Sequence, residues 1–230
     1  MTTYAFPPHA IPTVPVEDQG GGSGVVFPVR RILCVGRNYA AHRREMGGDD
    51  RDPPFFFAKP ADAIVPEPTK APYPPATTDL HHEIELVVAL KGGGANLTPQ
   101  QALEAVFGYA VGVDLTRRDL QAQAKAKGQP WEAAKAFDAS APISAIRIMA
   151  APPPGAAVTL SVNGVERQRG QVGDMIWNIA EVIAKASELW TLAAGDLIFT
   201  GTPEGVGAVV RGDTIVGEVE GVGRLEFTLV

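Results

Sequence analysis

Short apolar runs, each ended by glycine or proline, alternate with polar segments along most of the chain. These runs are rich in β-branched residues and leucine and are too short for long helices, so they predict strands. Val158, Leu160 and Val162 alternate toward Asn163-Gly164, a pair that favours a two-residue hairpin turn. Other strands or extended segments are expected at 31–36, 53–66, 81–90, 109–115, 196–201, 213–221 and 224–230.

Four helices are predicted from capping residues and from apolar residues at helical spacing. Thr98 and Gln101 have the spacing of a capping box, and so do Thr116 and Asp119. Gly128 is a suitable residue to end the helix that follows the second box. The helices are expected at about 38–47, 98–107, 116–128 and 177–189.

The start of the chain differs from the rest. Several prolines are followed by GGGSG, a combination that cannot propagate a helix and has few groups to pack. From Val29 the pattern becomes regular. We therefore expect an N-terminal arm over 1–28 and a single catalytic domain over 29–230, with a strand-rich α+β fold.

Composition and charge exclude several functions. The 230 residues carry a formal net charge of −6, which argues against a nucleic acid partner because phosphate binding needs a basic surface. A single cysteine, Cys34, cannot form an internal disulfide, and this favours a reducing cytoplasm. Since no run of 18 apolar residues occurs, we expect no membrane partner either.

Glu83 and Glu85 give the clearest chemical signal. The two residues lie two positions apart on a strand, so their side chains point to the same face and two like charges come close together. A hard divalent cation with oxygen ligands would stabilise such a pair, and Asp114 at the end of another strand is a candidate third ligand. A solvated strand face is the alternative.

Histidines offer a second set of candidates. His42 and Glu45 lie three residues apart on an expected helix, so the carboxylate could orient the imidazole as a base that activates water. An exposed histidine beside an incidental glutamate is the alternative. His81 and His82 flank the strand carboxylates, but neither HExxH nor CxxC is present to support a zinc site.

The segment GTPEGVG at 201–207 resembles a phosphate loop but lacks the Gly-Lys-Ser/Thr ending. A turn that presents backbone N–H groups and Thr202 to a ligand carboxylate is one interpretation, and a purely structural turn is the other. Arg37, Lys59, Arg118 and Lys135 are cations on motif-rich segments, where each could also be an ordinary surface charge.

Six ordered segments of the chain resemble the fumarylacetoacetate hydrolase family: VGRNYAAHRREM, FFAKPADAIVP, HHEIELVVAL, GYAVGVDLTRRDLQ, KGQPWEAAKAFDASAPIS and GDLIFTGTPEGVG. The resemblance covers about 29–230 and implies the family's mixed β-sandwich roll, a Mg²⁺ or Mn²⁺ site and a homodimer. Within the family, the proline-rich arm and DPPFFFAKPADAIVP are most similar to hydrolases that cleave fumarylpyruvate in gentisate degradation.

The resemblance also implies roles at matching positions. The metal ligands would be Glu83, Glu85 and Asp114, the water-activating pair His42 and Glu45, the catalytic lysine Lys135, and the substrate-binding residues Arg37, Lys59, Arg118, Gln121 and Thr202.

The implied reaction is hydrolysis of a C–C bond in a 2,4-dioxo acid, most specifically fumarylpyruvate and water to fumarate and pyruvate. His42 and Glu45 would activate water, and Lys135 would stabilise the charge that develops. Three alternatives stay open: an oxaloacetate decarboxylase, an isomerase or decarboxylase of the homoprotocatechuate route, and a non-catalytic metal-dependent binding protein. The expected partner is a small dicarboxylate or oxo acid.

Overall fold

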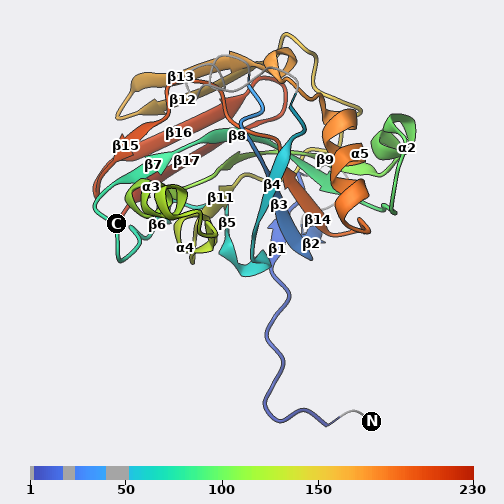
Figure 1. Ribbon diagram of the computed structural model, residues 1–230, viewed down its shortest axis with the longest axis horizontal. Helices are drawn as coiled ribbons and strands as arrows, with labels where there is room; N and C mark the ends of the chain where they lie inside the picture. The colour runs from blue at the N-terminus through green and yellow to red at the C-terminus, as the bar shows by residue number, and fades with distance from the viewer. Residues whose placement is uncertain (1–2, 18–23, 40–51) are drawn as a thin grey trace.

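A seven-stranded sheet runs through the computed structural model, which describes residues 3–17, 24–39 and 52–230 (Figure 1). Both parallel and antiparallel pairs occur within it. In spatial order its strands are β4 (Phe55–Lys59), β3 (Arg31–Gly36), β14 (Asp196–Phe199), β8 (Ile84–Leu90), β9 (Val106–Val113), β11 (Ala141–Ile143) and β5 (Ile64–Pro66).

Three smaller sheets accompany it. The largest has five strands, in the order β13 (Val165–Gln171), β12 (Ala157–Val162), β16 (Thr214–Val219), β17 (Gly223–Leu229) and β6 (Lys70–Ala71). A three-stranded sheet contains β10 (Thr116–Arg117), β7 (Leu80–His82) and β15 (Gly207–Val209), and a two-stranded sheet pairs β1 (Thr13–Pro15) with β2 (Val26–Pro28).

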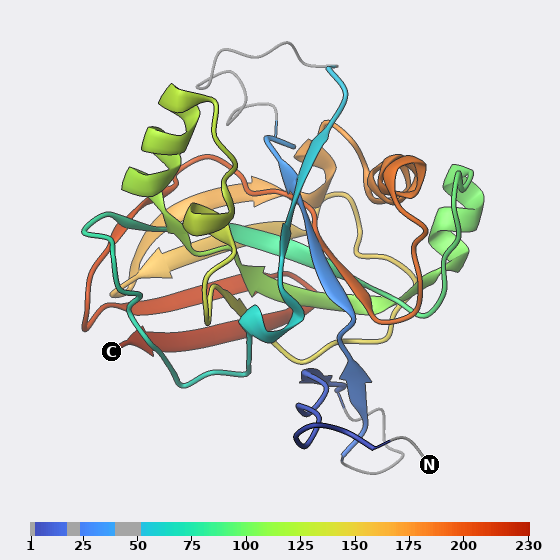
Figure 2. The same cartoon turned by 60° about the horizontal axis from the view of Figure 1, so that its bottom comes forward.

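Helices flank the seven-stranded sheet in two groups. Figure 2 shows α3 (Arg118–Lys127) and α4 (Glu132–Lys135) on one side of β3 and β4, with α2 (Pro99–Glu104) and α5 (Ile179–Leu189) on the other. Two short 3-10 helices lie at Ala61–Ala63 and Val172–Asp174. None of the helices in the described part of the chain is long and apolar enough to cross a membrane.

The position of β8 within the sheet explains why its sequence is almost continuously apolar. Leu86 and Val88 pack into the larger core with side chains of the five-stranded sheet, while Val87 and Ala89 pack into a second core on the opposite face. All seven residues of β8 are buried, because both faces of this sheet are covered. The predicted strand-rich α+β fold is confirmed.

Several local predictions are confirmed. The hairpin turn has φ of 52° at Asn163 and 77° at Gly164, as a two-residue primed turn requires. Thr98 and Gln101 form the expected capping box, and Gly128 ends α3 with φ of 62°. The helix expected at 98–107 ends at Glu104, because the chain from Val106 onward joins β9.

Two predictions are wrong in an informative way. Thr116 does not cap α3: Arg117 occupies that position, and the Thr116 hydroxyl accepts a hydrogen bond from Lys135 instead. The strand expected at 81–90 is two strands, β7 and β8, which belong to different sheets and meet at Glu83. The helix expected at 38–47 lies largely outside the described residues.

The division into an arm over 1–28 and a catalytic domain over 29–230 stays a prediction. Within the expected arm, Val14 and Phe27 are buried and belong to the second core. Residues 3–12 run away from the sheets as an extended segment (Figure 1), in which Tyr4, Phe6 and Ile11 are exposed.

Candidate active site

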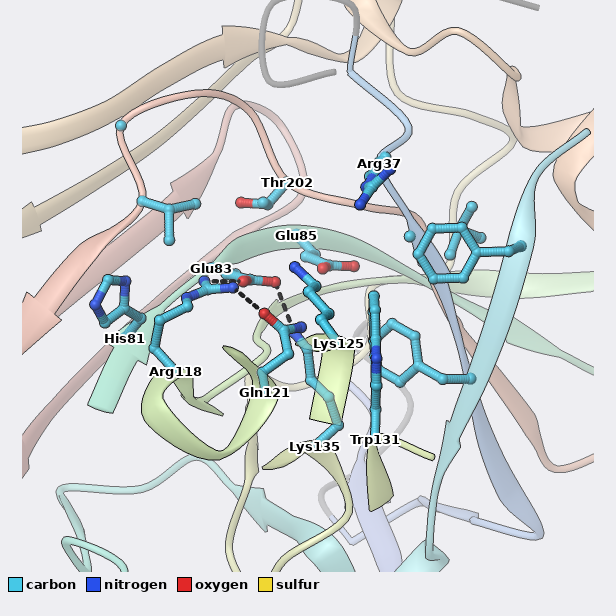
Figure 3. Close-up of a pocket in the computed structure, with 16 residues that line it drawn as sticks. Arg37, His81, Glu83, Glu85, Arg118, Gln121, Lys125, Trp131, Lys135 and Thr202 are labelled. Carbon is cyan, nitrogen blue, oxygen red and sulfur yellow. Dashed lines mark hydrogen bonds and ion pairs between the residues drawn. The ribbon is translucent and has the colours of Figure 1, made fainter. Parts of the chain in front are cut away.

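A cavity of about 330 Å³ opens where β7 passes into β8. Strands β3 and β4, helices α3 and α4, and the loop between β14 and β15 supply the rest of its lining. It brings together most of the residues that the sequence singled out, namely Arg37, Glu83, Glu85, Arg118, Gln121, Lys135 and Thr202 (Figure 3).

Three buried carboxylates lie at the centre of the site. Glu83 occupies the point where the chain changes sheets, and its backbone carbonyl accepts a hydrogen bond of 2.8 Å from the backbone N–H of Asp114. Oxygen atoms of Glu83, Glu85 and Asp114 lie within 4.8 Å of one another. The predicted neighbourhood of Asp114 with the glutamate pair is therefore present, and we call these three residues the carboxylate triad.

Cations hold two members of the triad. Lys135 Nζ lies 2.8 Å from Glu83 Oε2 and 2.6 Å from Asp114 Oδ2, and Arg118 pairs with the other oxygen of Glu83. Burial alone would raise the pKa of Glu83, but the positive charges of Lys135 and Arg118 have the larger effect and hold that pKa low. Burial alone would lower the pKa of Lys135, but the negative charges of Asp114 and Glu83 have the larger effect and raise that pKa. Both groups are therefore charged at neutral pH.

Glu85 differs from the other two carboxylates. Its Oε2 accepts a hydrogen bond of 2.7 Å from the backbone N–H of Gly201, yet no lysine or arginine among the described residues forms an ion pair with it. Burial, with the charges of Asp114 and Glu83, raises the pKa of Glu85 well above its usual value. A buried carboxylate short of positive charge, within an all-oxygen donor set, fits a hard divalent cation.

Lys59 lies behind Asp114 and not on the cavity wall. Its Nζ lies 2.8 Å from Asp114 Oδ1, where the two groups form an ion pair that lacks the alignment of a hydrogen bond. The same Nζ donates hydrogen bonds to the backbone carbonyls of Leu115 and Lys135. The side chain is fully buried. This position orients Asp114 and the backbone of α4, and so differs from the substrate contact that we expected.

Thr202 follows β14 in a loop that Gln168 of β13 ties to β8. Gln168 Nε2 donates to Thr202 Oγ1 at 2.8 Å, while its Oε1 accepts from the backbone N–H of Ile84 at 3.1 Å. Because the Thr202 oxygen accepts this bond, its own hydrogen is available to a ligand in the cavity. No helix follows the loop, which runs into β15, so the phosphate-loop alternative is wrong.

Arg118 and Gln121 meet on one face of α3. Arg118 Nη1 donates to Gln121 Oε1 at 2.6 Å, which leaves the Gln121 amide nitrogen as the donor for a ligand. Arg37 lies at the opposite wall with φ of 58°, in the left-handed region that residues other than glycine rarely adopt. Strain of this kind concentrates at functional sites.

The histidines have separate environments. His42 and Glu45 lie outside the described residues, so their expected role stays a prediction. His81 Nε2 is 2.9 Å from Asp79 Oδ1, and His82 Nδ1 is 2.9 Å from Gln168 Oε1. None of the described histidines belongs to the carboxylate triad, which gives a zinc site no support.

The sequence reasoning missed Lys125, Trp131 and Gln168. Lys125 lines the cavity from α3, and Trp131 lines it just before α4. A signal for Lys125 was present, because 118, 121 and 125 are spaced three and four apart and share one helix face. Gln168 carried no such signal, since it lies in a hairpin strand remote in sequence from every motif.

Comparison with known proteins identifies the class. Residues 31–230 match the family described as fumarylacetoacetate (FAA) hydrolase C-terminal. The chain belongs to the fumarylacetoacetate hydrolase family and is an enzyme of that family, as its sequence predicted.

Particular relatives share most of the chain. A crystal structure of fumarylpyruvate hydrolase from Pseudomonas aeruginosa in complex with Mn²⁺ and pyruvate is 48% identical, with a TM-score of 0.92 and coverage of 99% of both chains. A fumarylpyruvate hydrolase of a Ralstonia species is 43% identical over 180 residues, covering 76% of this chain and 92% of its own. An oxaloacetate tautomerase of Escherichia coli is 41% identical over 204 residues, covering 87% and 93%. The Mn²⁺ in the Pseudomonas aeruginosa structure and the triad of this chain together support a divalent metal site.

Proposed function

We propose that the protein is a divalent-metal-dependent hydrolase of 2,4-dioxo acids that converts fumarylpyruvate and water to fumarate and pyruvate. One observation carries the proposal: a buried carboxylate triad lies beside Lys135 and Arg118 in a cavity, in a chain 48% identical to a fumarylpyruvate hydrolase crystallised with Mn²⁺ and pyruvate. Pyruvate is one product of this reaction.

Glu83, Glu85 and Asp114 would hold the cation, either Mg²⁺ or Mn²⁺. When bound, it would supply Lewis-acid stabilisation of negative charge on the carboxylate and 2-oxo group of the substrate. The pairing of Lys135 and Arg118 with Glu83 keeps that ligand ionised and oriented.

The remaining side chains would bind the substrate and stabilise developing charge. Water adds to the C4 carbonyl, and the C3–C4 bond then breaks to release fumarate and the enolate of pyruvate, which takes a proton at C3. The positive charge of Lys135, whose Nζ already donates to Glu83, Asp114 and Thr116, and the free hydrogen of Thr202 would stabilise an oxyanion in this cavity. Removal of a proton from water is the role predicted for His42 and Glu45.

Arg118 and Gln121 would contact polar groups of the substrate. Arg118 already donates to Glu83 and Gln121, so its position is set before a ligand arrives. The amide nitrogen of Gln121 then supplies a donor of fixed direction. Such preorganised contacts reduce the ordering cost of binding.

A second function is favoured by the similarity to the Escherichia coli oxaloacetate tautomerase. Keto–enol conversion of oxaloacetate would need the same carboxylate chelation and a proton shift, but no C–C cleavage and no attacking water. The two functions therefore differ in whether pyruvate is released.

A substrate panel with both readouts tests the proposal. Fumarylpyruvate, acetylpyruvate and oxaloacetate would be offered with Mn²⁺, with Mg²⁺ or after thorough chelation, while enol absorbance and pyruvate release are followed. We expect metal-dependent pyruvate release from fumarylpyruvate. Full turnover after chelation would contradict the metal dependence, and loss of oxaloacetate enol without any pyruvate release would favour the tautomerase.

The homodimer and the place in gentisate degradation are predictions of the family resemblance, and the cytoplasmic location is a prediction from the single cysteine. Light scattering in solution would test the first. The apolar residues of the extended segment 3–12, Tyr4, Phe6 and Ile11, offer surface that a second copy could cover.

A further inference from the structure

One end of the cavity combines aromatic side chains with two cations that form no ion pair with another described residue. Arg37, Phe55, Lys125 and Trp131 form this aromatic end, and all four line the cavity. Figure 3 shows Arg37 and Lys125 reaching into the cavity from opposite walls, with Trp131 beside Lys125. Their side chains come from three separate parts of the chain.

Contacts within the aromatic end fix its shape. The rings of Phe55 and Trp131 meet edge to face with centroids 5.3 Å apart. Lys125 Nζ lies 5.0 Å from the Trp131 ring, and the Arg37 guanidinium lies 5.9 Å from the Phe55 ring. The two cations are thereby held over flat apolar surfaces at the cavity wall.

These cations lack the partners that the other cavity cations have. Arg118 and Lys135 pair with Glu83, whereas no carboxylate among the described residues forms an ion pair with Lys125 or Arg37. Burial, then Arg118 and Arg37, lowers the pKa of Lys125 to about 8. The aromatic end is thus a place where positive charge is in excess, and an anion would relieve it.

The aromatic end is continuous with the triad. Lys135 Nζ, which contacts Glu83 and Asp114, lies 5.0 Å from the Phe57 ring, and Phe57 lies 6.2 Å from Trp131. A substrate whose 2-oxo acid end lies at the triad can therefore extend along these rings. A planar unsaturated acyl chain suits such a surface.

We infer that Lys125 and Arg37 form a subsite for a second carboxylate, at the far end of the acyl group of a 2,4-dioxo acid. The inference rests on the proposed function and assigns residues that would select acylpyruvates ending in a carboxylate, as fumarylpyruvate does. Lys125 is the residue to which this specificity is assigned, because no carboxylate among the described residues forms an ion pair with it and it lies over the Trp131 ring.

The specificity ratio tests this subsite. We expect Lys125→Met to lower the ratio of kcat/KM for fumarylpyruvate to that for acetylpyruvate by about 10- to 100-fold, the range of a hydrogen bond to a charged group. Lys125→Arg should restore most of the ratio. Lys127→Met, an exposed lysine on the same helix, is the matched control and should leave the ratio unchanged. An unchanged ratio in Lys125→Met, or an equal fall in the control, would overturn the inference.

A binding measurement separates this inference from the proposed reaction. Calorimetry would compare fumarate with crotonate, which lacks the second carboxylate, on the Mn²⁺-loaded protein. We expect fumarate to bind more tightly to the native protein, with that preference lost in Lys125→Met and kept in Lys127→Met. Equal binding of both acids to the native protein would overturn the subsite even if pyruvate is released, whereas absent turnover with a retained fumarate preference would reject only the reaction.

Discussion

The carboxylate triad and the aromatic end are neighbours in one cavity but are built in opposite ways. Glu83, Glu85 and Asp114 are at most 7% exposed. Two of them are already paired with Lys135 or Arg118 inside the protein. At the aromatic end, Lys125 and Arg37 are only partly buried and have no carboxylate partner among the described residues.

This difference separates two tasks. Buried charges that satisfy one another form a rigid arrangement with a high cost of disruption, as the stabilisation of a cation and of developing charge requires. Unpaired cations at a half-exposed wall can discriminate between ligands at little cost to folding. The triad would thus set the reaction, and the aromatic end would set which acyl group is accepted.

Replacing Glu85 should give the largest effect and break the triad without removing a native ion pair. Glu85→Gln keeps an oxygen for the Gly201 N–H but loses a charged ligand, so Mn²⁺ affinity should fall at least about 100-fold, the upper effect of residues that only orient ligands. Calorimetric titration with Mn²⁺ measures this.

The same variant should stabilise the metal-free protein, because Glu85 is a buried carboxylate that forms no ion pair with a lysine or arginine among the described residues. Each kcal/mol recovered would raise Tm by about 2–4 °C for a chain of this size. Glu104→Gln, on the exposed surface of α2, is the control and should change neither quantity. A lower metal-free Tm in Glu85→Gln would show that its charge is already compensated.

Replacing Lys135 should remove a catalytic charge and also lower the stability of the protein. Lys135→Met leaves Glu83 and Asp114 without their shared cation, and breaking a buried pair in this way costs about 3–5 kcal/mol. Urea unfolding of the metal-free protein measures the loss. Lys185→Met breaks the exposed pair with Glu188 and should cost only about 0–1 kcal/mol. Equal losses in the two variants would mean that the interior of the site is as well solvated as the surface.

The sequence predicted the triad better than it predicted how the chain assembles it. Alternation placed Glu83 and Glu85 on one face, and this proximity is present although the strand breaks between β7 and β8. The point where the chain passes from one sheet to another leaves no signal in the local sequence, because the residues of both β7 and β8 are typical of strands. Thr116 failed as a helix cap for a similar reason: Lys135, far along the chain, bonds its hydroxyl.

The aromatic end shows where sequence reasoning stops. The i, i+3, i+7 spacing of Arg118, Gln121 and Lys125 was visible, but it could not show that Lys125 faces Trp131. That contact depends on the packing of α3 beside the segment that enters α4. Family resemblance identified the triad and Arg37, whereas Lys125 stands out only in three dimensions, where it lines the cavity and forms no ion pair with a described carboxylate.

Gln168 connects the triad strand to the Thr202 loop, so changing it should have a moderate effect on both stability and turnover. Gln168→Leu leaves the Ile84 N–H and the Pro203 carbonyl without this partner, at a cost of about 1–3 kcal/mol. As a positioning residue, it should lower kcat/KM about 10-fold.

A double-mutant cycle distinguishes this positioning role from general loosening. If Gln168 acts through Thr202, Gln168→Leu should lower kcat/KM much less in a Thr202→Val background than alone. Gln123→Leu, on the exposed face of α3, is the control. Fully additive effects of the two changes would assign Gln168 to the fold alone.

The smallest expected effect is a pH dependence at the aromatic end. A lysine is cationic below its pKa and neutral above it, and burial with Arg118 and Arg37 lowers the pKa of Lys125 to about 8, against the opposing charge of Glu83. The cationic fraction should fall about fourfold between pH 7 and 8.5, and kcat/KM for fumarylpyruvate should follow it because this quantity reports the free enzyme. Acetylpyruvate, measured in the same buffers, corrects for titration elsewhere in the site; Lys135 stays charged throughout, because Asp114 and Glu83 raise its pKa. Lys125→Arg should move the fall to higher pH, since a guanidinium stays charged throughout this range. A profile that is the same for both substrates would remove Lys125 from the recognition of the acyl group and leave the contrast with the triad without a functional meaning.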